Sequence, residues 1–167
     1  VGRAFTIARQ AQKTWAATTL NHRIAIIERF HDLVLENAET LLDIAQWENG
    51  KTRTNAMDEI LDIALTCRYY ARTSRKSLKE KRRRGAFPVV TVAYEHHHPL
   101  GVIGVISPWN YPLTLAVSDF LPALIAGNAV VAKPDAQTPL CALVLVDLLY
   151  KAGVPKDVVK VVMGDGA

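Results

Sequence analysis

The sequence lacks the features that mark secreted, membrane-spanning and several catalytic classes of protein. It has no signal peptide, and its longest apolar stretch, residues 113–132, is broken by Asp119, Pro122 and Asn128 before it reaches the length of a membrane span. The G-x-S-x-G, P-loop and H-E-x-x-H patterns are also absent. We therefore predict a soluble, cytoplasmic protein with no membrane partner.

Cysteine is scarce, with only two residues in the chain and no C-x-x-C pair. This count argues against a disulfide framework, and reduced thiols are expected. Cys67 and Cys141 each lie in a run of helical, apolar character, which favours buried structural thiols over nucleophiles. The triplet at residues 96–98 is the one histidine cluster, and it places His96 and His98 on one face of an extended strand. Two such residues do not close a metal site, so no metal is expected.

Charge of one sign is concentrated in a single segment. The chain has a net charge of +4, and residues 68–84 hold nine of its twenty Lys and Arg residues with Glu80 as the one acidic residue among them. The basic run at residues 79–84 is typical of a nucleic-acid or membrane-surface contact, or of a solvated helix end and turn. Because no recognition helix, zinc module or stacking aromatic accompanies it, we favour the helix end and expect no nucleic-acid partner.

Half of the 167 residues are hydrophobic, which is enough for a domain with an apolar core. Their periodicity predicts helices at residues 3–20, 22–38, 40–49 and 52–77, with Asn21 as the N-cap of the second and Gly50 ending the third. Residues 87–97 alternate as a strand, and short apolar strands at 102–106, 129–132 and 158–163 alternate with helices at 112–126 and 139–152. This order predicts an α/β fold with a parallel sheet.

Ligands of such sheets bind beyond the carboxyl ends of the strands. The first of the three strands ends in a loop that two prolines stiffen, and its candidate residues are Ile106, Ser107, Pro108, Trp109 and Asn110. An amide held there is suited to donate a hydrogen bond to an oxyanion. The other interpretation of Asn110 is an ordinary turn residue beside a packed tryptophan.

The second strand ends at Lys133, followed by Pro134, Asp135 and Ala136. A lysine that leaves a buried strand can reach a ribose hydroxyl or a phosphate, or it can extend to solvent and pair with Asp135. The third strand is followed by Gly166, which would let a ligand approach the backbone closely.

Read together, these loops strongly resemble the aldehyde dehydrogenase superfamily. Residues 99–112 (PLGVIGVISPWNYP) resemble its first core motif and residues 122–134 (PALIAGNAVVAKP) its second. The segments QTP at 137–139 and AGVP at 152–155 follow in family order, and QWENGK at 46–51 resembles the family's E-x-G-K turn. Details at residues 69–72 and 83–88 are most similar to the actinobacterial succinate-semialdehyde dehydrogenase branch.

The resemblance covers essentially the whole chain and implies its organisation. Residues 1–84 would form the helical amino-terminal part of the cofactor-binding domain, and residues 85–98 a β segment of the oligomerisation extension. Residues 99–167 would form the first part of a Rossmann-like NAD(P)-binding domain, with three strands of its parallel sheet.

The resemblance also implies roles for the loop residues. Asn110 would donate its amide to the thiohemiacetal oxyanion, and Lys133 would bond the adenosine ribose. Ser107, Pro108 and Trp109 would line the cofactor cleft, and Gly166 would approach the adenosine half. Family members that prefer NAD carry Glu where this chain has Ala136, and a missing carboxylate removes repulsion against a 2′-phosphate. The resemblance therefore implies NADP, with NAD also accepted.

In the family, the nucleophilic cysteine, the general-base glutamate and the pyrophosphate-binding turn follow the third strand. We therefore expect the chain to be the amino-terminal portion of a dehydrogenase that oxidises an aldehyde, with succinate semialdehyde as the expected substrate. The portion alone would be inactive, and the full-length enzyme a homodimer or homotetramer. Two other hypotheses are a truncated non-catalytic remnant or β-pairing interaction module, and a nucleic-acid binder that uses the basic run.

Overall fold

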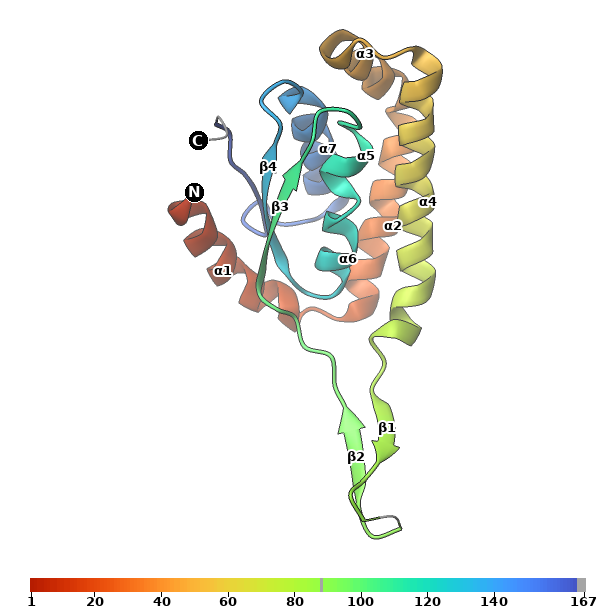
Figure 1. The fold of residues 1–167 in the computed structure, drawn as a ribbon, viewed down its shortest axis with the longest axis vertical. Coiled ribbons are helices and arrows are strands. Elements are labelled where there is room, and N and C mark those ends of the chain that lie inside the picture. Colours follow the sequence, from red (N-terminus) through yellow and green to blue (C-terminus); the bar gives the residue numbers. More distant parts are fainter. Residues whose placement is uncertain (88, 165–167) are drawn as a thin grey trace.

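A computed structural model describes residues 1–87 and 89–164 and shows an α/β fold (Figure 1). Within the described residues, four amino-terminal helices precede a three-stranded parallel sheet, as the sequence predicted, and a two-stranded antiparallel hairpin lies between them, which it did not predict. The helices are α1 (Gly2–Ala17), α2 (Leu20–Glu36), α3 (Ala38–Asn49) and α4 (Arg53–Ser77). None of the described helices combines the length and the apolar character that crossing a membrane requires.

The helix boundaries follow from their caps. The Thr19 and Thr52 side chains accept hydrogen bonds from the backbone amides three residues ahead and so begin α2 and α4. Gly50 ends α3 with a φ of +76°, as predicted. The assignment of Asn21 as N-cap was wrong because Thr19, in extended conformation, already caps the helix. The Asn21 side chain instead accepts a hydrogen bond from Arg75 at 3.0 Å.

The basic run lies on a strand rather than at a helix end and turn, so that prediction was wrong. Strand β1 (Lys81–Arg84) pairs antiparallel with β2 (Val92–Glu95), and the hairpin projects from the body of the molecule (Figure 1). All four residues of β1 are exposed, which keeps their charges in water. The Arg83 guanidinium lies 2.7 Å from the Glu95 carboxylate, and its hydrogen bond lowers the pKa of that carboxyl group.

A single strand over residues 87–97 was also wrong, because the strand β2 begins only at Val92 and a turn precedes it. The Thr91 hydroxyl and backbone amide both donate to the Phe87 carbonyl and close this turn. The division of the chain between residues 84 and 85 consequently falls inside the hairpin rather than before it.

The parallel sheet has the order β3-β4-β5, with strands β3 (Val102–Ser107), β4 (Ala129–Pro134) and β5 (Val159–Val161). Helix α1 packs on one face and crosses all three strands, whereas α7 (Pro139–Ala152) lies with α2 and α4 on the other side (Figure 1). The helix expected at 112–126 is two short helices, α5 (Thr114–Val117) and α6 (Phe120–Ile125). The interruption lies at Ser118 and Asp119. Pro122, in the first turn of α6, has no N–H to donate to the Ser118 carbonyl, so a continuous helix cannot form across this point.

A buried arginine joins the amino-terminal helices to the end of α6. Arg23 on α2 is 8% exposed, and its guanidinium donates to the carbonyls of Ile125 at 2.8 Å and of Trp15 and Ala16 at 3.4 Å. The Trp15 indole donates to the Leu124 carbonyl at 2.9 Å. Burial lowers the pKa of Arg23. These bonds fix α1 and α2 relative to the crossover between β3 and β4.

Candidate functional site

The carboxyl ends of the parallel strands place the two predicted loops side by side. In the sheet register Ile106 is the direct partner of Lys133, and Ser107 that of Pro134. The Val162 amide donates to the Ala132 carbonyl at 2.8 Å, which continues the sheet beside the residue before Lys133. The structure therefore brings the candidate residues of the first and second strands to one edge.

The loop after β3 presents its polar group to solvent. Ser107 is buried, whereas Ile106 and Trp109 are exposed, and the Asn110 side chain is exposed as well. Among the described residues, none forms a hydrogen bond with the Asn110 amide. A turn asparagine commonly bonds its own neighbouring backbone, and no such bond is present among the described residues. The role of Asn110 as a donor to a ligand stays a prediction.

The loop after β4 leaves its lysine without a carboxylate partner. Within the described part of the chain, no carboxylate oxygen lies within 4.0 Å of the Lys133 ammonium nitrogen. The Asp135 carboxylate instead accepts from the Gln137 backbone amide at 2.9 Å, which forms a local turn. The described residues therefore show no ion pair of Lys133 with Asp135, and Lys133 is half-buried. Its bond to a ligand stays a prediction. Ala136 is exposed at the same loop.

The third candidate loop extends past the described residues. Strand β5 leads into Met163 and Gly164, and Gly164 has a φ of +148°. The predicted ligand contact at Gly166 lies outside the described residues.

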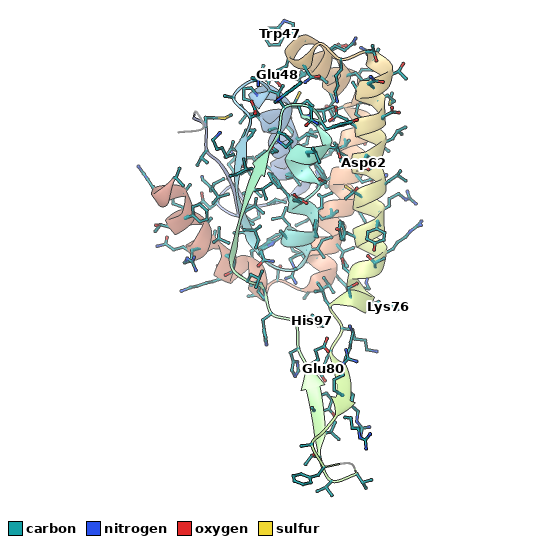
Figure 2. All side chains as sticks on the ribbon, in the orientation of Figure 1. Trp47, Glu48, Asp62, Lys76, Glu80 and His97 are labelled. Atoms are coloured by element: carbon teal, nitrogen blue, oxygen red, sulfur yellow. The ribbon has the colours of Figure 1, made fainter. Side chains whose placement is uncertain are left out.

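Sequence reasoning missed the contacts that the end of α3 makes with the loop after β3 and with the start of α7. The Glu48 carboxylate accepts from the backbone amides of Leu140 at 2.6 Å and Cys141 at 2.8 Å, at the start of α7. Asn49 donates to the Trp109 carbonyl at 2.8 Å. Figure 2 shows Glu48 at the end of the molecule where β3 and β4 terminate. The E-x-G-K turn was noted in the sequence, but its contacts could not be read from it.

A buried ion pair lies under the same loop. The Glu59 side chain on α4 is 1% exposed, and it pairs with the Lys51 ammonium. Its other carboxylate oxygen accepts from the backbone amides of Leu113 at 2.8 Å and Thr114 at 3.1 Å. The Lys51 ammonium also lies 4.1 Å from the centre of the Tyr111 ring. The segment that follows Asn110 is thus held by the Glu59 carboxylate and contacted by the Lys51 ammonium.

Both cysteines are buried, as predicted, and neither is activated. Burial raises the pKa of Cys67 to about 12, and burial together with the nearby Glu48 raises that of Cys141. A nucleophilic thiol needs the opposite shift, so these two residues serve packing.

This burial predicts slow thiol chemistry in the folded state. At pH 8 we expect both thiols to react with a disulfide reagent far more slowly in the native protein than in 6 M guanidinium, because the folded state holds them protonated. Above about pH 9 the unfolded thiols ionise first, so rising pH favours unfolding. Equal native and denatured rates at pH 8 would contradict this assignment.

The histidine triplet follows β2 at the base of the hairpin, away from the carboxyl ends of the parallel strands, as the labelled His97 shows (Figure 2). His96 lies 3.1 Å from the Glu80 carboxylate and His97 lies 3.3 Å from that of Glu95. Across residues 1–87 and 89–164, no group of three His, Cys, Asp or Glu side chains is arranged to hold a metal ion.

The geometry agrees with the comparison with known proteins. The model of the aldehyde dehydrogenase family matches residues 1–167. The chain belongs to the aldehyde dehydrogenase family. A Mycolicibacterium smegmatis protein named "Putative succinate-semialdehyde dehydrogenase", with NADP(+) in its name, is 53% identical over 167 residues, which are 100% of this chain and 32% of that protein. A protein of the same name, numbered 2, from Mycobacterium tuberculosis is 49% identical over 164 residues, or 98% of this chain and 32% of the relative.

Solved structures of this dehydrogenase family share the fold. An NAD-dependent benzaldehyde dehydrogenase from Corynebacterium glutamicum matches with a TM-score of 0.90 and 34% identity, over 98% of this chain and 36% of that one. An aldehyde dehydrogenase from Brucella melitensis biovar abortus matches with a TM-score of 0.92 and 30% identity, over 98% and 34%. The chain thus spans about a third of the length of the aldehyde dehydrogenases that it matches.

Proposed function

We propose that the chain is the amino-terminal part of an NADP-dependent aldehyde dehydrogenase that oxidises succinate semialdehyde. The observation that supports this most directly is that the loops carrying Asn110 and Lys133 leave the same carboxyl edge of a parallel sheet, with neither side chain bonded to another described residue. The substrate class rests on the mycobacterial relatives, which carry succinate semialdehyde in their names at 53% and 49% identity.

In the proposed reaction a cysteine thiolate adds to the aldehyde carbon, and the carbonyl oxygen becomes an oxyanion. The exposed Asn110 amide donates a hydrogen bond to that oxygen and stabilises the charge as it develops. Pro108 restricts the backbone of this loop, and Asn49 donates to the Trp109 carbonyl, which limits the motion of the neighbouring Asn110. Because Cys67 and Cys141 are buried, we propose that the nucleophile belongs to a segment outside residues 1–167 and that the chain alone is inactive.

The donor set of the second loop fits a dinucleotide. Lys133 offers an ammonium with no described carboxylate partner, and Ser107 with Ile106 lies directly beside it in the sheet register. When bound, the nicotinamide cofactor would accept the hydride of the reaction. Lys133 would hold the adenosine ribose and, in NADP, attract the 2′-phosphate, with Pro134, Asp135 and Ala136 shaping the same loop.

The test is a comparison of two proteins by NADPH absorbance. Full-length enzyme should reduce NADP in the presence of succinate semialdehyde with a higher kcat/KM than with benzaldehyde, whereas residues 1–167 alone should show no turnover. Failure of the full-length enzyme to reduce either cofactor with any aldehyde would overturn the proposal.

The cofactor preference depends on one small side chain. Replacing exposed Ala136 with Glu in the full-length enzyme should lower kcat/KM for NADP about tenfold or more, because a carboxylate near the 2′-phosphate repels it and can bond a ribose hydroxyl instead. The value for NAD should hold or rise.

Ala136→Gln is the matched control, since it adds the same bulk without charge. An equal loss of NADP preference in both variants would assign the effect to bulk and contradict the charge argument.

We also propose that the hairpin of β1 and β2 pairs with a second subunit in a homodimer or homotetramer. Its tip exposes Phe87, Val89 and Val90, and both of its strands present exposed residues, which a partner could cover. Sedimentation of the full-length enzyme with and without residues 81–95 tests this pairing.

A further inference from the structure

We propose that Glu59 is a positioning residue for Asn110, and that Lys51 sets the direction in which its carboxylate acts. The inference rests on the proposed function, because it concerns the donor of that reaction. Glu59 touches neither of the proposed ligands. It acts on the backbone that carries the Asn110 side chain.

The carboxylate of Glu59 divides its two oxygens between two tasks. Oε1 pairs with the Lys51 ammonium, and Oε2 accepts from both the Leu113 and Thr114 amides, at 2.8 and 3.1 Å. The exposed fraction of the side chain is 1% for Glu59 and 12% for Lys51, so water competes little for these bonds. Both oxygens of this buried carboxylate accept hydrogen bonds, and such charge-assisted bonds hold their partners firmly.

The two amides lie close to Asn110 along a stiff segment. Leu113 is three residues beyond Asn110, and Pro112 between them restricts the backbone. On the other side of Asn110, the Trp109 carbonyl accepts from Asn49. The loop is therefore held on both sides of the exposed donor, by Glu59 of α4 and by Asn49 at the end of α3.

Lys51 also determines what a substituted side chain could do. It is a donor only, as are the two backbone amides, so three donors converge on Glu59 from two directions. A glutamine there offers one oxygen and one NH₂ group. If the glutamine oxygen faces Lys51, the glutamine NH₂ group faces the Leu113 and Thr114 amides. These groups are all donors, so they cannot bond one another and the loop must move away. Without Lys51, the oxygen can turn to the amides and restore the loop.

This asymmetry separates a positioning role from a structural one. In the full-length enzyme, Glu59→Gln should lower kcat about 10- to 100-fold, the scale for a displaced catalytic group, and leave the KM for NADP unchanged. The double variant Lys51→Met with Glu59→Gln should recover most of that kcat. The matched control is Ile63→Val, one turn further along α4, which is fully buried and away from the loop; it should keep the wild-type kcat.

Hydrogen exchange of the Leu113 and Thr114 amides gives a readout besides activity. Exchange should accelerate in Glu59→Gln and slow again in the double variant. If the glutamine variant does not fold, Glu59→Asp replaces it, since it keeps the charge for Lys51 but withdraws the oxygen from the amides by one methylene. It should also lower kcat.

An unchanged kcat in the folded Glu59 variants overturns the inference, as does a double variant no better than Glu59→Gln. Failure of the proposed function is a separate result: the wild-type full-length enzyme would then show no aldehyde-dependent NADPH formation. The exchange measurement still tests the control of the loop in that case.

Discussion

Replacing Asn110 with Ala in the full-length enzyme should lower kcat by about 10²–10³-fold, the usual loss for one oxyanion donor. The side chain is exposed at the end of β3 and has no described partner, so its removal leaves no buried group unsatisfied. Stability and the KM for NADP should therefore remain at their wild-type values. Steady-state rates by NADPH absorbance and thermal unfolding of the same samples check both parts.

Asn55→Ala is the matched control for that experiment. Asn55 is also an exposed asparagine, and it lies in the first turn of α4, where only its backbone amide bonds the Thr52 hydroxyl. Its substitution should leave kcat unchanged. A wild-type kcat in the Asn110 variant would remove this residue from the reaction.

The largest loss of stability should follow from replacing Arg23 with Ala. The guanidinium donates to the carbonyls of Ile125, Trp15 and Ala16 in a buried setting. Its removal takes this donor from the Ile125 and Ala16 carbonyls and opens a cavity, whereas the Trp15 carbonyl keeps its bonds from Thr18. We expect the free energy of unfolding to fall by about 3–4 kcal/mol, the range for a buried network broken on one side. Urea unfolding followed by circular dichroism measures the change.

Arg29 provides the comparison on the same helix. It is exposed, and its replacement with Ala should change the free energy of unfolding by about 0.5 kcal/mol or less. Arg23→Lys should recover only part of the loss, because an ammonium cannot span the separate carbonyls that the planar guanidinium reaches. Equal losses in Arg23→Ala and Arg29→Ala would show that the buried network contributes little.

The sheet could be predicted because its strands carry their own signal. Apolar, β-branched runs separated by helical segments predict a parallel arrangement. In the structure, the register of these strands places Ile106 beside Lys133. The fates of Cys67 and Cys141 were equally local, since both sit in apolar helical runs.

The hairpin was mispredicted because its signal is not local. The four basic residues of β1 have no strand pattern of their own and are extended only because β2 pairs with them. The prediction of the N-cap of α2 was wrong for a more local reason. Thr19 and Asn21 are both residue types that cap helices, and the helix begins after the earlier one.

The network below the first loop was missed for reasons of distance along the chain. Glu59 bonds amides 54 and 55 residues away, and Glu48 bonds amides 92 and 93 residues away. A periodic pattern places such carboxylates on a helix but does not tell which backbone they meet. Asn110 and Lys133 could be predicted as candidates because ligands of parallel sheets bind at the strand ends, whereas Glu48 and Glu59 lie on helices without that signal.

The carboxylate of Glu48 has one more consequence for how a nucleotide can lie on this sheet. Helix α7 follows β4, and its first amides would be a natural seat for a phosphate. Those of Leu140 and Cys141 are instead occupied by an anion of the protein itself. We therefore expect that a dinucleotide bound as proposed would have its diphosphate turned away from α7. Lys133 would then bond the sugar, and the contacts to the diphosphate would lie elsewhere.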